Sequence, residues 1–448
     1  MKFPERPSLG KAAPWSPPSP VRRVLDRKAT IYAHVDATLP LVSVRIQLPI
    51  GSVDDPLDMP GATALAAAMM QEASGDHSSL ERSAAFDRLA ARSSAVAGKD
   101  WTTVTLDVHR DRLYAALPLV VDAFVRPRFL EGDWERVLGR HVTGISQGLD
   151  DNGFVSAQVT PSALFGADHP YGHPVHGTID GCNATTLVEA QRRWNVAHDR
   201  AAPSIAVTGD IDLDAFVERL GSLLPMCAGR ARVPVVPVGA KPGRYFVDSP
   251  GSQQTAVRVA LPGPSGRSPE RHALDLARIA LGGSFTSRLN QRLREEKGYT
   301  YGARLAMACW QGTGAISAAA SVQADATAPA LADTLEVLRT AALAGFDDDE
   351  IERSRAQALH DLVDVAESRA GLSGAYALEI EAGRDPMAVG ALGETIAAVD
   401  RAAVNAATRQ WIDPHEATII LVGDWSAVGE SLEAFGDWTR VDPFGRPI

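Results

Sequence analysis

The feature that most constrains this 448-residue chain is a weak internal repeat. The segment VRIQLP at 44–49 recurs as VRVALP at 257–262, an offset of 213 residues. Near the end of each half, IAVTGD at 205–210 recurs as IILVGD at 419–424, an offset of 214 residues. These units are far longer than the ~20 to 50 residues of a solenoid repeat. The repeat therefore predicts two similar domains of about 200 residues each.

Changes in composition set the expected boundaries. Residues 1–20 contain six prolines and little apolar material, so we expect residues 1–25 to form an extended, Pro-rich arm. Prolines and glycines interrupt 230–244, which we interpret as an interdomain linker between domains at 26–229 and 245–448. Alternating strand patterns stand among longer segments with helical periodicity in each domain. We predict an α+β fold of two homologous domains, each a mainly antiparallel sheet flanked by helices.

Composition excludes several classes of function. The chain has 44 basic and 55 acidic residues, a formal charge of -11, and no long Lys/Arg run, so nucleic acid is not an expected partner. No apolar run approaches the ~20 residues of a membrane span. The three cysteines, Cys182, Cys227 and Cys309, are odd in number and far apart, which argues against a disulfide framework or a zinc knuckle. We interpret them as buried, unreactive thiols.

The segment RLREEKGYTYGAR at 292–304 combines a charged stretch with a sharp turn. The pattern predicts a helix that Ser284 or Thr286 could cap, a left-handed stop at Gly298, and a strand that begins at Tyr299. Arg294 and Tyr301 then flank the corner. An arginine can form a forked contact to a carbonyl or carboxylate, and a tyrosine hydroxyl can donate to an oxyanion. Spacing alone favours a solvated helix end and a structural tyrosine over a functional pair.

Four segments together carry a family resemblance. They are VSVRIQLPIGSVDDP at 42–56, HPYGHPVHGT at 169–178, VTGDID at 207–212 and LGGSFTSRLNQRLREEKGYTYG at 281–302. With these, the chain from about Val42 onward resembles the pitrilysin and insulinase family of zinc peptidases, in the short two-domain form of the mitochondrial processing peptidase subunits. The resemblance implies that Arg294 and Tyr301, seven residues apart, are the arginine and tyrosine that bind substrate and stabilise the transition state in that family.

The chain departs from the family at the zinc motif. Active members carry His-x-x-Glu-His on a helix, which places two imidazoles on one face for zinc and a Glu to activate water. Here the corresponding segment is GATALAAAMMQE at 61–72, and its leading glycine aligns Ala64, Ala67 and Ala68 with those positions. The third ligand of the family, a later Glu, aligns near Gly144. Methyl groups and hydrogen cannot bind zinc, so we expect no metal and no cofactor in this chain.

Nearby and alternative groups do not replace the motif. Glu72 and His77 have the wrong spacing for it. The sequence GISQG at 144–148 matches a nucleophile elbow around Ser146, but it follows a helical segment, whereas the elbow needs strand, turn and helix. The cluster of His169, His173 and His176 is a second candidate, because three imidazoles could bind a metal ion.

Prolines and glycines separate these three histidines and exclude a helix that would align them, so a packed, hydrogen-bonded loop is favoured over a metal site. No Gly-rich loop precedes a helix and lysine in the Walker arrangement, and nucleotide binding is not indicated.

These observations lead to one functional hypothesis with two alternatives. The chain is expected to be the noncatalytic subunit of a heterodimeric zinc peptidase, inactive alone, that supplies Arg294 and Tyr301 to unfolded peptide substrates while a zinc-bearing homologous subunit supplies the metal. One alternative is a structural or peptide-binding homologue with no role in cleavage, comparable to the peptidase-like core subunits of respiratory complexes. The other is a self-sufficient hydrolase using Ser146 or the histidine cluster. The Pro-rich arm favours a periplasmic location, with the cytoplasm as the alternative.

Overall fold

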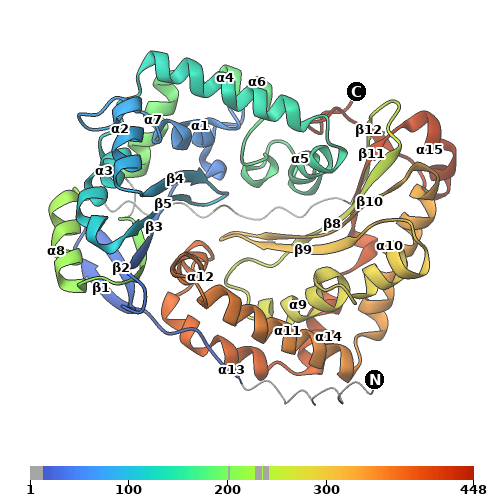
Figure 1. Cartoon of the computed structure of the whole chain (residues 1–448). Coiled ribbons are helices and arrows are strands. Elements are labelled where there is room, and N and C mark those ends of the chain that lie inside the picture. Colours follow the sequence, from blue (N-terminus) through green and yellow to red (C-terminus); the bar gives the residue numbers. More distant parts are fainter. Residues whose placement is uncertain (1–13, 200–201, 228–234, 236–241) are drawn as a thin grey trace, which may run out of the picture.

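Two six-stranded sheets face each other across the middle of the molecule (Figure 1). This computed structural model describes residues 14–199, 202–227, 235 and 242–448. Residues 1–13 of the expected arm, and 228–234 and 236–241 in and beside the expected linker, lie outside the described residues. We refer to residues up to 227 as the first half of the chain and to residues from 242 onward as the second half.

The first sheet has the order β1-β2-β6-β3-β5-β4. Four of its neighbouring pairs are antiparallel, and β2 pairs with β6 in parallel. The strands are β1 Val21–Leu25, β2 Ala29–Val35, β3 Leu41–Leu48, β4 Arg92–Ala97, β5 Thr102–His109 and β6 Ser204–Gly209.

The second sheet repeats this plan with the order β12-β7-β11-β8-β10-β9. Its pairs from β11 to β9 are antiparallel, and its pairs from β12 to β11 are parallel. The strands are β7 Arg244–Asp248, β8 Gln254–Gly263, β9 Ala303–Cys309, β10 Gly314–Gln323, β11 Thr418–Gly423 and β12 Thr439–Arg440. The predicted α+β class, with two mainly antiparallel sheets flanked by helices, is confirmed.

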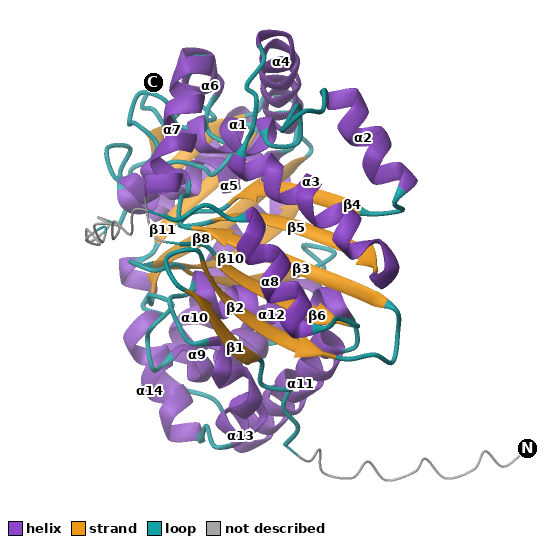
Figure 2. Ribbon diagram, turned by 90° about the vertical axis from the view of Figure 1, so that its left-hand side faces the viewer, coloured by secondary structure: helices purple, strands orange, loops and turns teal. Residues whose placement is uncertain are grey.

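Helices cover the outer face of each sheet, and each half has its own apolar core. In the first half, α3 and α8 lie over the sheet (Figure 2). The helices of this half are α1 Ala62–Met69, α2 Ser79–Arg88, α3 Leu113–Val125, α4 Glu131–Gly148, α5 Asn152–Phe165, α6 Ile179–Ala184, α7 Leu187–Asp199 and α8 Leu213–Leu223.

In the second half, α9, α10 and α14 pack on the sheet. The helices of this half are α9 Arg271–Arg278, α10 Thr327–Ala344, α11 Asp348–Ala366, α12 Arg369–Glu381, α13 Leu392–Ala397, α14 Arg401–Trp411 and α15 Trp425–Leu432. Among the helices that the structure describes, none has both the length and the apolar character needed to cross a bilayer.

The N-terminal segment connects the two halves. Residues 21–25, expected within the extended arm, form β1 at the edge of the first sheet. The preceding residues contact the second half: the Tyr376 hydroxyl donates to the Pro18 carbonyl at 2.6 Å, and the Gly393 N–H donates to the Ser16 hydroxyl at 2.9 Å. These contacts hold the start of the described chain against the α12–α13 region.

Each half covers the inner face of the other half's sheet. Helix α5, from the first half, packs on β8 and β11 of the second sheet, and α12, from the second half, packs on β3 and β6 of the first sheet (Figure 1). The Ser373 hydroxyl of α12 forms a hydrogen bond with the Ser43 hydroxyl of β3 at 2.9 Å. The apolar side chains buried around α5 include Val155, Val159, Ala163, Ala256, Ala260, Ile420 and Val422.

A buried polar cluster joins the turn between β9 and β10 to the first half. The Tyr171 hydroxyl donates to Asp100 Oδ1 at 2.8 Å and accepts from the Gly312 N–H at 3.1 Å. The Gln311 N–H donates to Asp100 Oδ2 at 2.9 Å. Hydrogen bonds to charged groups are stronger than neutral ones, so this cluster fixes the turn against the first half.

Lys99 completes the cluster. Its ammonium, on a residue only 7% exposed, donates to the Tyr171 carbonyl at 3.1 Å and to the His173 carbonyl. It also lies 5.6 Å from the centre of the Trp310 ring, which stacks on Tyr171 with 5.5 Å between centroids. Burial lowers the pKa of Lys99 to about 7. The loop at 169–178 is therefore packed and hydrogen-bonded at the junction of the halves.

Removing the Tyr171 hydroxyl should weaken this junction. Tyr171→Phe removes the hydroxyl's hydrogen bonds to Asp100 and to the Gly312 N–H, and we expect the free energy of unfolding to fall by about 1–3 kcal/mol. Denaturant titration measures this loss. Tyr114→Phe on α3, where the tyrosine is 41% exposed, is the matched control. Equal losses in the two variants would contradict the role given to the Tyr171 hydroxyl.

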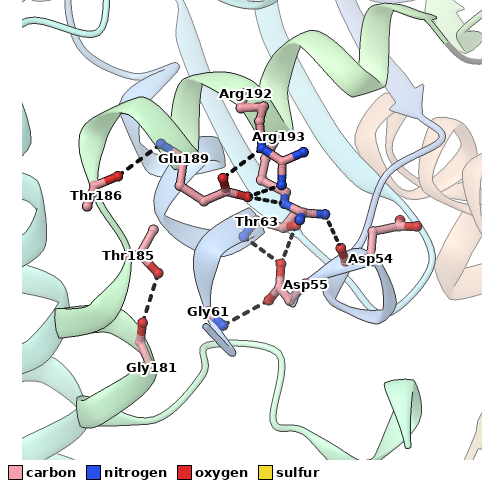
Figure 3. Close-up of polar contacts among 10 residues, drawn as sticks. All are labelled: Asp54, Asp55, Gly61, Thr63, Gly181, Thr185, Thr186, Glu189, Arg192 and Arg193. Carbon is pink, nitrogen blue, oxygen red and sulfur yellow. Dashed lines mark hydrogen bonds and ion pairs between the residues drawn. The ribbon is translucent and has the colours of Figure 1, made fainter. Parts of the chain in front are cut away.

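A buried carboxylate holds the start of α1 (Figure 3). Asp55 Oδ2 accepts from the Gly61 N–H at 2.8 Å, and Asp55 Oδ1 accepts from the Thr63 N–H at 2.8 Å and the Thr63 hydroxyl at 2.5 Å. Arg193 on α7 donates to the neighbouring Asp54 carbonyl at 2.5 Å. Gly61 itself has φ of 107°, a left-handed conformation that favours glycine.

Burial raises the pKa of Asp55 to about 6, because desolvation outweighs the hydrogen bonds from Thr63 and Gly61 and the charge of Arg193. The folded state therefore binds this proton more tightly than the unfolded chain, where the pKa is 3.8. The stabilisation from the bound proton is present below about pH 4 and is lost as the pH rises through about 6.

Asp55→Asn should remove this pH dependence. We expect the unfolding free energy of the wild type minus that of the variant to fall by about 2–2.5 kcal/mol between pH 4 and pH 7, since one pKa unit corresponds to about 1.4 kcal/mol and the unfolded carboxyl is already partly ionised at pH 4. Denaturant titrations of both proteins across this range measure the difference. A difference that does not change with pH would mean that Asp55 is already ionised in the folded protein.

Candidate functional site

The three alanines that align with the zinc motif lie on α1, inside the predicted helix at 61–72. This helix packs against α4 and α7. Ala67 is buried, and Ala64 and Ala68 are partly buried against the first core. Alanine has the highest helix propensity and buries no polar group, so the segment forms a stable helix without offering any metal ligand.

Ala68 and Gly144 line the same small cavity, of about 340 Å³, between α1 and α4. The structure thus brings together two positions that align with zinc ligands on separate helices of the family. His141 and His176 also line this cavity, and Phe154 of α5 closes one side with its ring 5.2 Å from that of His176. The walls are mainly apolar.

The groups in this cavity do not fit the family's zinc site. The His141 ring Nε2–H donates to the His176 carbonyl at 2.8 Å, and burial lowers the pKa of His176 to about 4. Arg140 also lines this cavity, and its guanidinium lies 3.4 Å from Glu72, so it adds a positive charge near the cavity and no metal ligand. Within the described part of the chain, no three His, Cys, Asp or Glu side chains gather closely enough to hold a metal ion.

Glu72 is committed to ion pairs. Its carboxylate is buried at the end of α1, 2.6 Å from Arg136 and 3.4 Å from Arg140, both on α4. His77 lies beyond it in a short backbone bridge with Ser74. Neither Glu72 nor His77 lines the cavity beside Ala68 and Gly144.

The segment that carries Arg294 differs in detail from the prediction. Helical structure begins after Ser287, whose carbonyl accepts from the Gln291 N–H, and neither Ser284 nor Thr286 caps it. Residues Asn290–Glu296 form a π-helical turn. Gly298, with φ of 65°, is the left-handed stop that the sequence predicted. Such π-helical turns are frequent at functional sites.

The predicted strand start at Tyr299 is wrong, because β9 begins at Ala303. The Thr300 hydroxyl forms hydrogen bonds to the backbone of Gly302, donating to its carbonyl at 3.0 Å and accepting from its N–H at 3.2 Å. This local turn delays the strand by four residues. Tyr301 therefore stands in a loop, and it is 94% exposed.

Arg294 and Tyr301 lie on either side of this corner. The Arg294 guanidinium stacks 4.0 Å above the Phe285 ring and lies 3.4 Å from Glu295. Tyr301 lines a groove of about 540 Å³ between the two halves, whereas Arg294 is not among the lining residues. In the described residues, no hydrogen bond or cation–π contact joins the two side chains. Both are partly or fully accessible to a ligand.

The groove also contains two arginines that sequence reasoning missed. Arg258 on β8 donates to the Ser156 hydroxyl at 3.1 Å and to the Ser317 hydroxyl at 3.3 Å, and Arg304 lies on β9. Burial and the charge of Arg304 lower the pKa of Arg258 to about 10. The available signal was the repeat itself, because VRIQLP and VRVALP share an arginine at the second position.

The alternative chemical sites find no support in the geometry. Ser146 lies in the last turns of α4, so GISQG is helical and no strand leads into it. His169 Nδ1 accepts from the Tyr171 N–H at 3.1 Å, and its ring lies 5.9 Å from that of Phe165. His173 is buried, while His176 faces the separate cavity beside α1. The cluster of three histidines is divided among different contacts.

Comparison with known proteins identifies the family that shares this architecture. The family model described as insulinase (peptidase family M16) matches residues 31–148, and the model described as peptidase M16 inactive domain matches residues 201–358. A protein of Mycobacterium tuberculosis named as an uncharacterised zinc protease is 28% identical over 351 residues, which cover 75% of this chain and 79% of that protein.

Solved structures share the fold. A peptidase M16 inactive domain from Pseudomonas fluorescens aligns with a TM-score of 0.83 and 21% identity over 90% of this chain and 98% of that one. A protease from Helicobacter pylori aligns with a TM-score of 0.79 and 14% identity, covering 91% and 99% of the two chains. The chain belongs to the M16 (insulinase) peptidase family, as a member that lacks the zinc-binding motif.

Proposed function

We propose that this chain is the noncatalytic subunit of a heterodimeric zinc peptidase. A homologous partner that carries His-x-x-Glu-His would supply zinc and the general base, and this chain would supply Arg294 and Tyr301 to the bound peptide. The activity then belongs to the pair. Neither chain alone would hold a complete site.

The observation that carries this proposal is an asymmetry within the molecule. The cavity beside Ala68 and Gly144 offers no ligand set for zinc, whereas Tyr301 is 94% exposed on the groove between the halves. A hydroxyl held in an open groove by a fixed turn can donate to an oxyanion that develops on a peptide. Arg294 lies one corner away, with a guanidinium that can form a forked contact to a carbonyl or carboxylate.

The test begins with isolation of the chain from its native host under conditions that preserve complexes. We expect a homologue with the His-x-x-Glu-His motif to accompany it, and the complex to cleave an unfolded fluorogenic peptide in a chelator-sensitive way. Recovery of the chain alone, or of a complex without peptidase activity, would favour a structural or peptide-binding role instead.

Substitution of the pair should lower turnover by the complex. Loss of one oxyanion donor costs about 100- to 1,000-fold in kcat, and we expect a loss of up to this size from Tyr301→Phe and a loss of at least about tenfold from Arg294→Ala. Assembly, followed by size-exclusion chromatography, should not change, because both side chains are accessible. Tyr114→Phe and Arg409→Ala, on other faces, are the matched controls; unchanged turnover in the Arg294 and Tyr301 variants would refute their role.

Metal analysis gives a second, independent measurement. The isolated chain, dialysed without chelator, should contain close to no zinc by elemental analysis, because the cavity beside α1 lacks the ligands. One zinc per chain would overturn the proposal. In that case His141→Ala and His176→Ala would show whether the metal sits in the cavity of Ala68 and Gly144.

A further inference from the structure

The two halves can be compared position by position, because the repeat offset and the strand registers agree. Arg45 of β3 and Arg258 of β8 are separated by the repeat offset of 213 residues. Arg45 lies opposite Thr105 on the neighbouring strand, and Arg258 lies opposite Ala319. The two arginines therefore occupy equivalent places on the inner faces of the two sheets, since directly opposed residues share a face.

In the first half, this arginine has an acidic neighbour. Arg45 lies 3.5 Å from Asp107, and the Asp107 carboxylate also accepts from the Ser43 hydroxyl at 2.6 Å. Asp107 is opposite Ser43 on β3. Arg92 of β4 is also opposite Asp107, so this carboxylate stands between two arginines on the same face of the sheet.

In the second half, the acidic neighbour is missing. Ser321, opposite Ala256, stands where the first half has Asp107. The edge-strand arginine also stands at a different position. Arg304 of β9 is opposite Ala319 of β10, whereas the first half has Ser94 of β4 at this position and its edge-strand arginine, Arg92, opposite Asp107. In the part of the chain that the structure describes, neither Arg258 nor Arg304 has a carboxylate within ion-pair distance.

The resulting row of charges is open to a ligand. Arg258, Ala319 and Arg304 lie side by side across three strands, and all three line the groove of about 540 Å³ that Tyr301 borders. This volume lies in the range of about 300–1,000 Å³ that is typical of ligand sites. The other sheet residues that line the groove are mostly small: Ala256, Ala306, Ser317, Ala320 and Ser321.

One carboxylate, Asp151, also lines the groove. It is engaged at the start of α5, where its Oδ1 accepts from the Phe154 N–H at 2.6 Å. Within the described residues it forms no ion pair with Arg258 or Arg304. Burial and the charge of Arg304 lower the pKa of Arg258, so the folded protein disfavours its charge unless an anion is present.

We infer that the Arg258–Arg304 row is a recognition site for a carboxylate of a bound peptide, supplied by an acidic side chain or by a free C-terminus. The inference deepens the proposed function and rests on its peptide-binding part, because it names the class of peptide that the groove selects. The bound carboxylate would take the place beside the two arginines that Asp107 holds in the first half. The net charge of -11 makes this local positive site distinct from the rest of the protein.

Peptide binding to the isolated full chain tests this directly. The probes are labelled, N-acetylated Ala/Ser peptides with a central Glu or Gln and an amidated C-terminus, together with the Gln peptide carrying a free C-terminal carboxylate. Fluorescence anisotropy at low ionic strength should show about ten- to hundredfold tighter binding of a carboxylate peptide than of the neutral one, as expected for hydrogen bonds to a charged group. Preference for the Glu peptide would assign a side chain, and preference for the free terminus a C-terminal ligand.

Two variants decide whether the arginine row is responsible. Arg304→Gln removes an exposed charge that supports no described contact, and Ser321→Asp restores the carboxylate found in the first half while both arginines stay. Each should reduce the preference to less than about twofold, whereas Arg409→Gln on the outer helix α14 should retain it. Equal binding of charged and neutral peptides by the wild type, or a preference that survives both variants, would overturn the inference.

This assay needs neither a partner subunit nor cleavage. A negative result in this assay would refute the carboxylate site. It would not affect the proposed role of Arg294 and Tyr301, which is tested by turnover of the complex. Conversely, if Arg294 and Tyr301 have no effect on turnover, a carboxylate preference that Arg304→Gln abolishes would still support the carboxylate site.

Discussion

The exchange of α5 and α12 between the halves is the interaction on which the rest of the structure depends. Each helix buries apolar side chains on the inner face of the opposite sheet, as Val159 does beside Ile420 and Tyr376 beside Ala206. Removing this cover would expose sheet residues that are now almost inaccessible to water, which is costly in proportion to the apolar area. The groove between the halves is therefore a product of the same packing that holds the halves together.

The zinc motif can be absent because other residues maintain the helix that would carry it. Asp55 fixes the first turn of α1, while Leu65 and Met69 on the same helix are buried in the first core. Methyl groups at Ala67 and Ala68 add no buried polar group that would need a partner. The helix keeps its place, and the neighbouring cavity has become a mainly apolar space with two histidines at its edge.

Sequence reasoning succeeded where a pattern was local or repeated. Apolar alternation and the 213-residue offset predicted two like α+β units, and Gly298 had the backbone freedom that a left-handed stop requires. It failed where a long-range contact or a small polar group decided the outcome: the Thr300 hydroxyl delays β9, and the Lys99–Asp100 pair meets Tyr171 only after the fold is complete. The sequence alone did not indicate Arg258 as a site, because only the strand register shows that Ser321 stands where the first half has Asp107.

The two halves have diverged in complementary ways. In the first half, the inner sheet face carries the Asp107 carboxylate between Arg45 and Arg92, so the protein itself supplies the anion. In the second half, the same place carries Arg258 and Arg304 with serine and alanine between them, and this face is the one that lines the groove. A duplicated fold in which each half covers the other's sheet keeps its stability while one face changes charge, because the apolar contacts of α5 lie on neighbouring residues such as Ala260 and Val422.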